Sequence, residues 1–222
     1  MFKHHRYPKA IILQAVYLKL RFTLSYRDIE ELLQLRGICV DHSTIQRWVF
    51  KFSPEIEKNM HKRKFKVGDS WRMDETYIKV GGKDRYLYRA VDKDGNTVDF
   101  LLTKRRQRMS AQKFLIKAIG NNGKPRVINI DKSGSNYSAI RSVNKRSLSM
   151  KKIKIRSVKY LNNIVEQDHR KIKRRIAITT GFKEFESAQR TLAGIEVVNI
   201  IMKNQVIDSK ATYFKTFVSL AA

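Results

Sequence analysis

The spacing of hydrophobic positions along the chain changes near residue 66. Before it, apolar side chains recur every three to four positions, which is the period of amphipathic helices. This spacing predicts helices at residues 10–20, 25–35 and 42–52. After residue 66 the period shortens to two, which is typical of strands. We therefore expect two domains, residues 1–66 and 67–222, the first ending in a basic linker at 58–66.

The pattern beyond residue 66 predicts an α/β fold. Three strands, joined by turns at GGKD and DKDGN, precede an alternation of helices and strands. We expect strands at residues 71–80, 85–91, 97–103, 126–131 and 151–158. We expect helices at residues 111–119, 162–178 and 184–203, and a further helix that begins at Tyr137. Ser110 would cap the helix at 111–119. This order predicts a mixed sheet with helices on its faces. Residues from Val206 onward show no clear pattern.

The second and third predicted helices resemble a DNA-reading motif. Gly37 lies in the connection between them, and two helices joined through such a turn match the helix-turn-helix pattern. The outer face of the second helix would then carry the candidate DNA contacts Thr44, Gln46, Arg47 and Lys51. The alternative is a plain helical bundle with a solvated polar face.

The charge of the chain favours a polyanionic partner. Lys and Arg number 47 against 20 Asp and Glu, giving a formal net charge of +27, and nucleic acid is the natural partner for such a surface. No stretch approaches eighteen uninterrupted apolar residues and no signal peptide is evident, so we expect a soluble intracellular protein. Cys39 is the only cysteine, and with His42 it offers two of the four ligands of a structural zinc site. We interpret Cys39 as a packing residue.

Three acids occupy unusual positions for so basic a chain. Asp74 lies inside a predicted strand, where Asp is depleted, and shares a face with Ile78. Alternation sends Glu75 to the opposite face. Asp131 ends an apolar strand, the place where ligands gather in open α/β sheets. Glu166 shares one helical stripe with the basic residues Arg170 and Lys173.

Each acid also has a structural reading. Asp74 could form an ion pair, Asp131 could cap a helix, and Glu166 could form an ordinary surface pair with Arg170. Taken together, converging carboxylates without a Cys or His pair favour Mg²⁺ or Mn²⁺. Two such ions can support in-line displacement at phosphorus, with the basic stripe holding the phosphodiester backbone.

The segments around these acids resemble a known family. Three segments look like the three acidic motifs of DDE transposases: WRMDETYIKV, VINIDK and SVKYLNNIVEQDHRKIKRR. Their amino-acid sequences resemble those of the IS6 family of insertion sequences. Asp131 and Glu166 are 35 positions apart (166 − 131), similar to the family's second spacing, and a basic residue follows seven positions after the Glu. The segments SYRDIEELLQLRG and GFKEFESAQRTLAGIE also look like the family, whereas KSGSNYSAI after Asp131 departs from it.

The resemblance implies a ribonuclease-H-like catalytic domain at residues 67–222. It implies that Asp74, Asp131 and Glu166 are catalytic and hold two Mg²⁺ ions, with Mn²⁺ as a substitute. It further implies binding to short terminal inverted repeats, 3′-end nicking by water, and attack of the freed 3′-OH on target DNA, with cointegrate formation. A homodimer or larger synaptic complex, in the cytoplasm of a prokaryote and associated with its nucleoid, would carry this out.

Two other functions remain open from the sequence. A catalytically decayed chain would be a non-enzymatic, sequence-specific DNA-binding protein, although such a protein has no need of three acids. An RNA-associated protein would use stacking aromatics, and Tyr86 with Tyr88 is a weak candidate pair. The alternating Lys152, Lys154 and Arg156 could lie along DNA or could protect a sheet edge.

Overall fold

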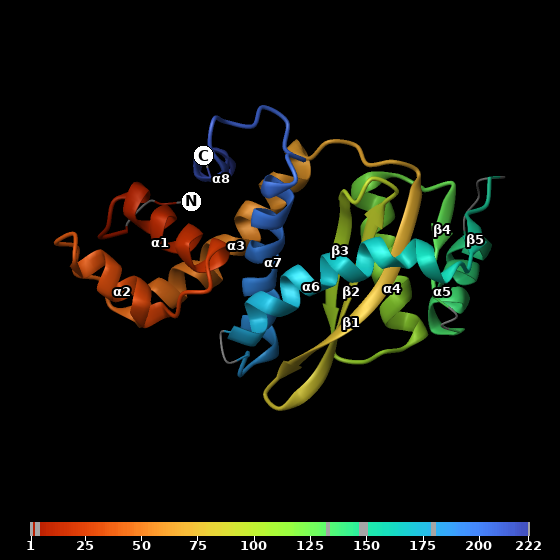
Figure 1. The fold of residues 1–222 in the computed structure, drawn as a ribbon, viewed down its shortest axis with the longest axis horizontal. Helices are drawn as coiled ribbons and strands as arrows, with labels where there is room; N and C mark the ends of the chain where they lie inside the picture. Colours follow the sequence, from red (N-terminus) through yellow and green to blue (C-terminus); the bar gives the residue numbers. More distant parts are fainter. Residues whose placement is uncertain (1, 3–4, 132–133, 147–150, 179–180, 222) are drawn as a thin grey trace. The chain divides into compact units, whose positions relative to one another are not determined.

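The computed structural model describes residue 2 and residues 5–131, 134–146, 151–178 and 181–221 (Figure 1). The chain divides into two compact units. One, the helical unit, combines Met1–Phe65 with Arg175–Ala222, and the other, the sheet unit, is Lys66–Arg174. Among the described residues, no helix has the length and apolarity needed to cross a membrane.

The helical unit contains the three helices predicted for the N-terminal region. They are α1 (Lys9–Arg21), α2 (Tyr26–Gln34) and α3 (His42–Arg63). A capping box starts α2, because Ser25 Oγ accepts from the N–H of Asp28 while the Asp28 carboxylate accepts from the N–H of Ser25. Gly37, with φ +72°, turns the chain between α2 and α3 in a conformation that other residues rarely adopt.

The third helix is longer than predicted, which corrects the expected basic linker at 58–66. The helix continues to Arg63 because Phe52, Ile56 and Met60, four residues apart, extend its buried stripe. Charged residues between these positions hide the stripe in the sequence. Beyond the helix, Phe65 N–H donates to the carbonyl of Gln205, which ties this segment to the C-terminal region of the same unit.

Two C-terminal helices complete the helical unit, α7 (Phe185–Met202) and α8 (Tyr213–Leu220). A Cβ added to Gly194 of α7 would lie 2.6 Å from the Leu20 methyl carbons and 2.7 Å from Ser53 Oγ, so α7 packs closely against α1 and α3. We expected residues 175–222 to fold with the sheet, whereas they belong to the compact unit of the N-terminal helices. The functional boundary near residue 66 stays a prediction. The sequence pattern also missed α8.

The sheet unit contains a mixed five-stranded sheet, as predicted. Its elements are β1 (Ser70–Val80), β2 (Lys83–Asp92), β3 (Thr97–Thr103), α4 (Arg108–Asn122), β4 (Val127–Asn129), α5 (Gly134–Arg146), β5 (Lys154–Arg156), a 3₁₀ turn η1 (Lys159–Asn162) and α6 (Asn163–Ile178). The strand order is β3-β2-β1-β4-β5. The first three strands are antiparallel, and β4 runs parallel to both β1 and β5.

The two faces of this sheet differ. One face buries an apolar core in which Trp71 and Met73 of β1 pack with Phe114 of α4 and Ile140 of α5. On the other face α6 lies across the sheet (Figure 1), where His169 approaches Asp74. Hydrophobic burial therefore packs α4 and α5 against one face of the sheet, whereas polar side chains lie among the contacts between α6 and the other face.

Three local expectations need correction. Ser110 does not cap α4, because the helix begins at Arg108 with Gln107 as its N-cap, and the Ser110 hydroxyl donates to the carbonyl of Arg105. Cys39 is exposed rather than packed. The helix expected from Tyr137 begins at Gly134. The first two residues of the KSGSNYSAI departure, 132 and 133, lie outside the described residues.

Candidate active site

Asp74 lies at the centre of the candidate site. It stands directly opposite Arg89 in the β1–β2 register, on the face covered by α6, and its side chain is 19% exposed. Burial, together with the negative charges of Glu75, Asp131 and Glu166, raises the pKa of Asp74 from 3.8 to about 7. The second and third predicted acids, Asp131 and Glu166, therefore both lie within electrostatic reach of Asp74.

Glu75, the neighbour of Asp74, faces the opposite way and is satisfied within the protein. Its side chain is 4% exposed, forms an ion pair with Arg106, and accepts a 2.8 Å hydrogen bond from Asn136 Nδ2. The predicted alternation of Asp74 and Glu75 is thus confirmed. Glu75 has the partners of a structural acid, whereas the strongest influences on Asp74 are desolvation and other negative charges.

Asp131 follows β4 by two residues, and a buried amide places this strand relative to α6. Asn129 Nδ2 donates to Asn162 Oδ1 at 2.7 Å and to the Val158 carbonyl at 3.0 Å, while Asn129 Oδ1 accepts from Val158 N–H. Asn129 precedes Asp131 by two residues, and Asn162 precedes Glu166 by about one helical turn. These hydrogen bonds fix the elements that carry the second and third acids.

A buried ion pair attaches α6 to the sheet. Arg89 Nη2 lies 2.7 Å from Asp168 Oδ2, and the two side chains are 0% and 6% exposed. Arg89 lies opposite Asp74 in the strand register, and Asp168 follows Glu166 by two residues on α6. The ion pair therefore joins the strand beside Asp74 to the helix that carries Glu166. Sequence reasoning missed this pair. The signal was present, because Arg89 interrupts the otherwise apolar end of the strand RYLYRAV.

His169 is a second residue that sequence reasoning missed. Its Nε2 lies 3.8 Å from Asp74 Oδ2, neither ring nitrogen makes a hydrogen bond, and both are buried. Burial and the positive charge of Arg89 lower its pKa to about 3, so the ring is neutral. A neutral imidazole with unsatisfied nitrogens therefore borders the acid cluster.

The donor set fits a hard divalent cation. The negative charges of Glu75, Asp131 and Glu166 add to the effect of burial in raising the pKa of Asp74, and a cation beside Asp74 would relieve that repulsion. Oxygen donors are the ligands that Mg²⁺ and Mn²⁺ prefer. Asp74, Asp131 and Glu166 could hold such ions.

A different acid and histidine group lies in the helical unit. Among the described residues, Glu30, Asp41 and His42 are a group of metal-ligating side chains whose atoms all lie within 4.8 Å of one another. Asp41 is the N-cap of α3 and accepts from Ser43 N–H, and His42 Nδ1 lies 3.0 Å from Glu30 Oε2. The contacts connect α2 to the start of α3, so this group is read as structural.

The basic stripe predicted on α6 is only partly free to meet DNA. Glu166 and Arg170 are exposed. The Lys173 ammonium lies 4.4 Å from the centre of the Tyr77 ring of β1, a cation–π contact. Lys173 is therefore in contact with the sheet.

The predicted DNA contacts of α3 lie on its outer surface. Gln46, Arg47 and Lys51 are exposed and Thr44 is half-buried. Arg47 donates to Thr44 Oγ1 at 3.2 Å and to Ser43, and Lys51 Nζ lies 3.1 Å from His5 Nε2. The face is available for DNA, and the role of each side chain stays a prediction.

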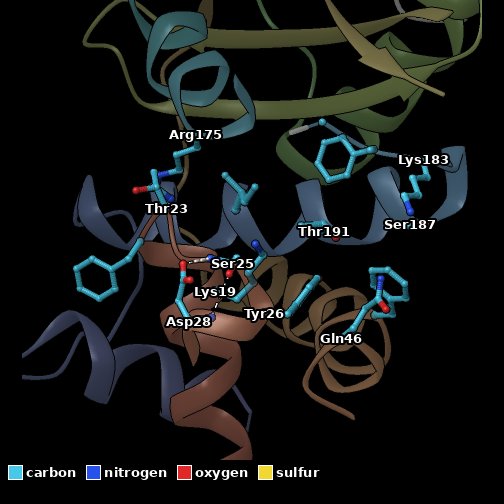
Figure 2. Close-up of a pocket in the computed structure, with 15 residues that line it drawn as sticks. Lys19, Thr23, Ser25, Tyr26, Asp28, Gln46, Arg175, Lys183, Ser187 and Thr191 are labelled. Atoms are coloured by element: carbon cyan, nitrogen blue, oxygen red, sulfur yellow. Dashed lines mark hydrogen bonds between the residues drawn. The ribbon is translucent and has the colours of Figure 1, made fainter. Parts of the chain in front are cut away.

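A pocket of about 510 Å³ in the helical unit borders Gln46 (Figure 2). Lys19 of α1 points its ammonium over the Tyr26 ring at 4.5 Å and donates to the Leu24 carbonyl at 2.7 Å. Burial raises the pKa of Tyr26 to about 12. Arg175 donates to the Leu20 carbonyl. The Lys19 and Arg175 side chains in this pocket therefore already make hydrogen bonds to backbone carbonyls of the same unit.

Comparison with known proteins places the site in a class. A family model described as a DDE domain, of the IS240 transposase type, matches residues 68–205. The transposase for insertion sequence-like element IS431mec of Staphylococcus aureus strain Mu50 is 42% identical over 202 residues, covering 91% of this chain and 88% of that protein. The transposase for element IS257 in transposon Tn4003 of the same species is 41% identical over the same shares.

Solved structures that resemble the chain include a viral intasome and an integrase core. A chain of the simian T-cell lymphotropic virus intasome in complex with the PP2A regulatory subunit B56 gamma is 16% identical. The match covers 85% of this chain and 70% of that chain, with a TM-score of 0.45. The catalytic core domain of BIV integrase is 16% identical, covers 68% of this chain and 95% of its own, and has a TM-score of 0.44.

The matched DDE domain and the transposase relatives define the chain as a DDE transposase, a polynucleotidyl transferase. The chain belongs to the IS6 family of insertion-sequence transposases. The family resemblance and the mixed α/β fold expected from the sequence are thereby confirmed.

Proposed function

We propose that the chain binds the short terminal inverted repeats of its element, nicks their 3′ ends and joins them to target DNA, with Asp74, Asp131 and Glu166 as the catalytic and metal-holding residues. The observation that carries this proposal is the raised pKa of Asp74, which the charges of Asp131 and Glu166 help to produce. Groups from a strand, a strand end and a helix act on one carboxyl. Such perturbation is typical of functional sites.

The chain's residues have distinct parts in the reaction. When bound, two Mg²⁺ ions, or Mn²⁺ in their place, would activate the attacking oxygen and stabilise the leaving oxygen of an in-line displacement. Asp74 must lose its proton to hold an ion. The Arg89–Asp168 pair would hold α6, which carries Glu166, against the strand partner of Asp74, and the Asn129–Asn162 hydrogen bond would hold the end of β4 that precedes Asp131. Arg170 and Lys173 would hold the DNA backbone near the acids.

The reaction has two transfers. In the first, a water oxygen attacks the phosphodiester at the element end, and the 3′ oxygen leaves and takes up a proton. In the second, that 3′-OH attacks a phosphodiester of the target DNA, which releases the target's own 3′-OH. Each transfer breaks one phosphorus–oxygen bond and forms another. The product is target DNA joined to the 3′ end of the element, and DNA synthesis from the released target 3′-OH would convert it to a cointegrate.

The helical unit would supply recognition. Thr44, Gln46, Arg47 and Lys51 on the outer face of α3 would contact the double-stranded repeats, with base and phosphate contacts divided among them. Pairing two element ends requires at least a homodimer. The chain would act on the nucleoid in the cytoplasm of a prokaryote.

The proposal is tested by cointegrate formation in cells that carry the gene and its flanking DNA. Glu166→Gln keeps the size of the side chain and removes its charge, and we expect it to abolish cointegrates. The matched control is Glu186→Gln, which removes an exposed helical glutamate paired with Arg190 outside the acid cluster, and should keep activity. Activity in Glu166→Gln would refute the assignment. Inactive wild type that still binds its ends would instead identify a decayed DNA-binding protein.

A further inference from the structure

A cationic pocket lies in the sheet unit at the amino-terminal ends of β1, β4 and β5. Its volume is about 590 Å³, and we call it the arginine pocket after the residues that line it, which include Ser70, Arg72, Arg126, Lys154 and Arg156. The strand register aligns Ser70 with Val127 and Lys154, and Arg72 with Asn129 and Arg156. Two arginines from separate strands therefore stand at one level of the sheet.

The two arginines are held together by a hydroxyl rather than by an acid. Arg72 Nη1 donates to Ser70 Oγ at 3.2 Å and to the Ser70 carbonyl at 2.8 Å, and Arg156 Nη2 donates to the same Oγ at 3.4 Å. Arg72 is only 7% exposed. Burial and the charge of Arg156 lower the pKa of Arg72, as expected for two cations brought together.

The nearby acids Asp92 and Asp94 offset part of the charge of Arg72, but their effect on its pKa is smaller than those of burial and of Arg156. Within the part of the chain that the structure describes, no carboxylate lies within 4.0 Å of a nitrogen of Arg72 or Arg156, and the Nε atoms of both are buried without a partner. Asp92 is occupied, since its oxygens accept from the N–H groups of Gly68, Asp94 and Asn96 and from Asn96 Nδ2. Asp69 pairs with Arg126 at 3.1 Å.

Further cations surround the pocket. Lys93 and Lys154 line it, and a neighbouring hollow that shares Asp69, Arg126 and Lys154 is also lined by Lys124, Lys151 and Lys152. Bringing so many like charges around the buried Arg72 and the half-buried Arg156 is unfavourable unless an anion is bound. Guanidinium groups in such a pair suit the oxygens of a phosphate, which accept several hydrogen bonds.

We propose that the arginine pocket is a phosphate-binding site, and that it takes a backbone phosphate of the DNA on which the transposase acts. The claim that the pocket binds a phosphate group is argued from the pocket alone. The claim that this phosphate belongs to DNA rests on the proposed function. Arg72 precedes Asp74 by two residues on the same face of β1, which is about 7 Å along the strand. The pocket therefore adds a non-specific backbone contact on the catalytic unit, separate from the contacts of α3.

The salt dependence of DNA binding by the full chain tests the proposal. Removing one phosphate-binding cation reduces the slope of log affinity against log salt by about 1. Binding of a duplex carrying the element's end is measured by fluorescence anisotropy over a range of salt, without divalent metal. We expect Arg156→Gln to reduce the slope by about 1 and to weaken binding equally to end and unrelated sequences.

The matched control is Lys113→Gln, which removes the same charge from an exposed position on α4, outside the pocket. Equal slopes for Arg156→Gln and Lys113→Gln would overturn the proposal. Lys154→Gln at the pocket rim provides a second variant if Arg156→Gln folds poorly, and its slope should also fall. Arg72 is less suitable, because it is buried.

Inorganic phosphate separates the two sources of the ligand. If the pocket takes DNA phosphate, free phosphate at matched ionic strength should raise the melting temperature of wild type more than that of Arg156→Gln, and Arg156→Gln should also lower the DNA slope. A phosphate-dependent rise without the DNA effect would overturn the DNA assignment. Loss of activity in every transposition assay, with the slope effect intact, would contradict the proposed reaction and leave the phosphate site standing.

Discussion

The two faces of the sheet bury comparable elements by different means. The face under α4 and α5 is covered by a continuous apolar core that includes Trp71, Met73 and Phe114. The face under α6 buries Arg72, Arg89 and Asp168 among its contacts. Apolar packing tolerates small shifts of the packed elements, whereas a buried ion pair demands one geometry. The difference suggests that one face supplies stability and the other fixes the positions of the acids.

The largest expected effect comes from removing an acid on the polar face. Asp131→Asn should reduce cointegrate formation to background, because a neutral amide lacks the negative charge with which a carboxylate holds Mg²⁺. Asp84→Asn removes an exposed aspartate that pairs with Lys79 in the β1–β2 hairpin, and should keep activity. If the Asp131→Asn protein is folded yet still active, the polar face is not the catalytic one.

The next prediction compares the faces in stability and activity together. Phe114→Ala on the apolar face and Arg89→Met on the polar face should each cost about 3 to 5 kcal/mol of the free energy of unfolding, by a cavity and by an unpaired buried Asp168 respectively. Urea unfolding measures both. The double variant Arg89→Met with Asp168→Leu should regain much of the stability, since no buried charge is left alone.

The activity of these variants sharpens the comparison. Assayed well below its melting temperature, Phe114→Ala should retain cointegrate formation, whereas the stabilised Arg89→Met with Asp168→Leu variant should remain impaired because the ion pair that orients Glu166 is missing. Full activity in the double variant would show that the ion pair serves stability alone.

A third prediction concerns pH. Because the pKa of Asp74 is about 7 in the folded chain and near 3.8 when unfolded, the folded state holds a proton that the unfolded state has released between these values. Stability from this group is therefore full below about pH 4, falls as pH rises to about 7, and is constant above, with a total change of a few kcal/mol. Unfolding in chelator should show this decline for wild type and not for Asp74→Asn.

Divalent metal provides the control for the pH prediction. At pH 8, Mg²⁺ should raise the melting temperature of wild type, because it compensates the ionised carboxylates, and should leave Asp74→Asn nearly unchanged. An equal response of both chains would contradict the assignment of Asp74 as a metal-holding residue.

The smallest expected effect is at the edge of α6. Lys173→Met removes the cation–π contact with Tyr77 while keeping the apolar stem, and should cost about 0.5 to 1 kcal/mol. Urea unfolding at constant ionic strength checks this value. Lys171→Met, an exposed neighbour on the same helix, should change the stability less.

The sequence predicted the elements with a clear period and missed features that depend on distant contacts. Asp74 is recognisable because it interrupts a predicted strand, and Asp131 because it ends the short apolar strand VINI. The extension of α3 was hidden because charged residues occupy the solvent side of its last turns. α8 is short, and its burial depends on Tyr17, whose ring packs near Phe217.

The polar positioning groups could not be derived from local pattern at all. Arg89 and Asp168 are 79 positions apart (168 − 89), and nothing in either neighbourhood identifies the partner. The same holds for Asn129 and Asn162, which are 33 positions apart. A single sequence indicates that an acid or amide is out of place, while the fold determines which group satisfies it.

The close contact at Gly194 has a consequence for the order of synthesis. The helical unit is discontinuous, because residues 66–174 are made between its N-terminal helices and α7. As the chain leaves the ribosome, the packing around Leu20 and Ser53 stays incomplete until α7 has been synthesised. The sheet unit can already form before then. A message cut short after Glu166 would therefore yield a chain that keeps Asp74, Asp131 and Glu166 but lacks a finished helical unit.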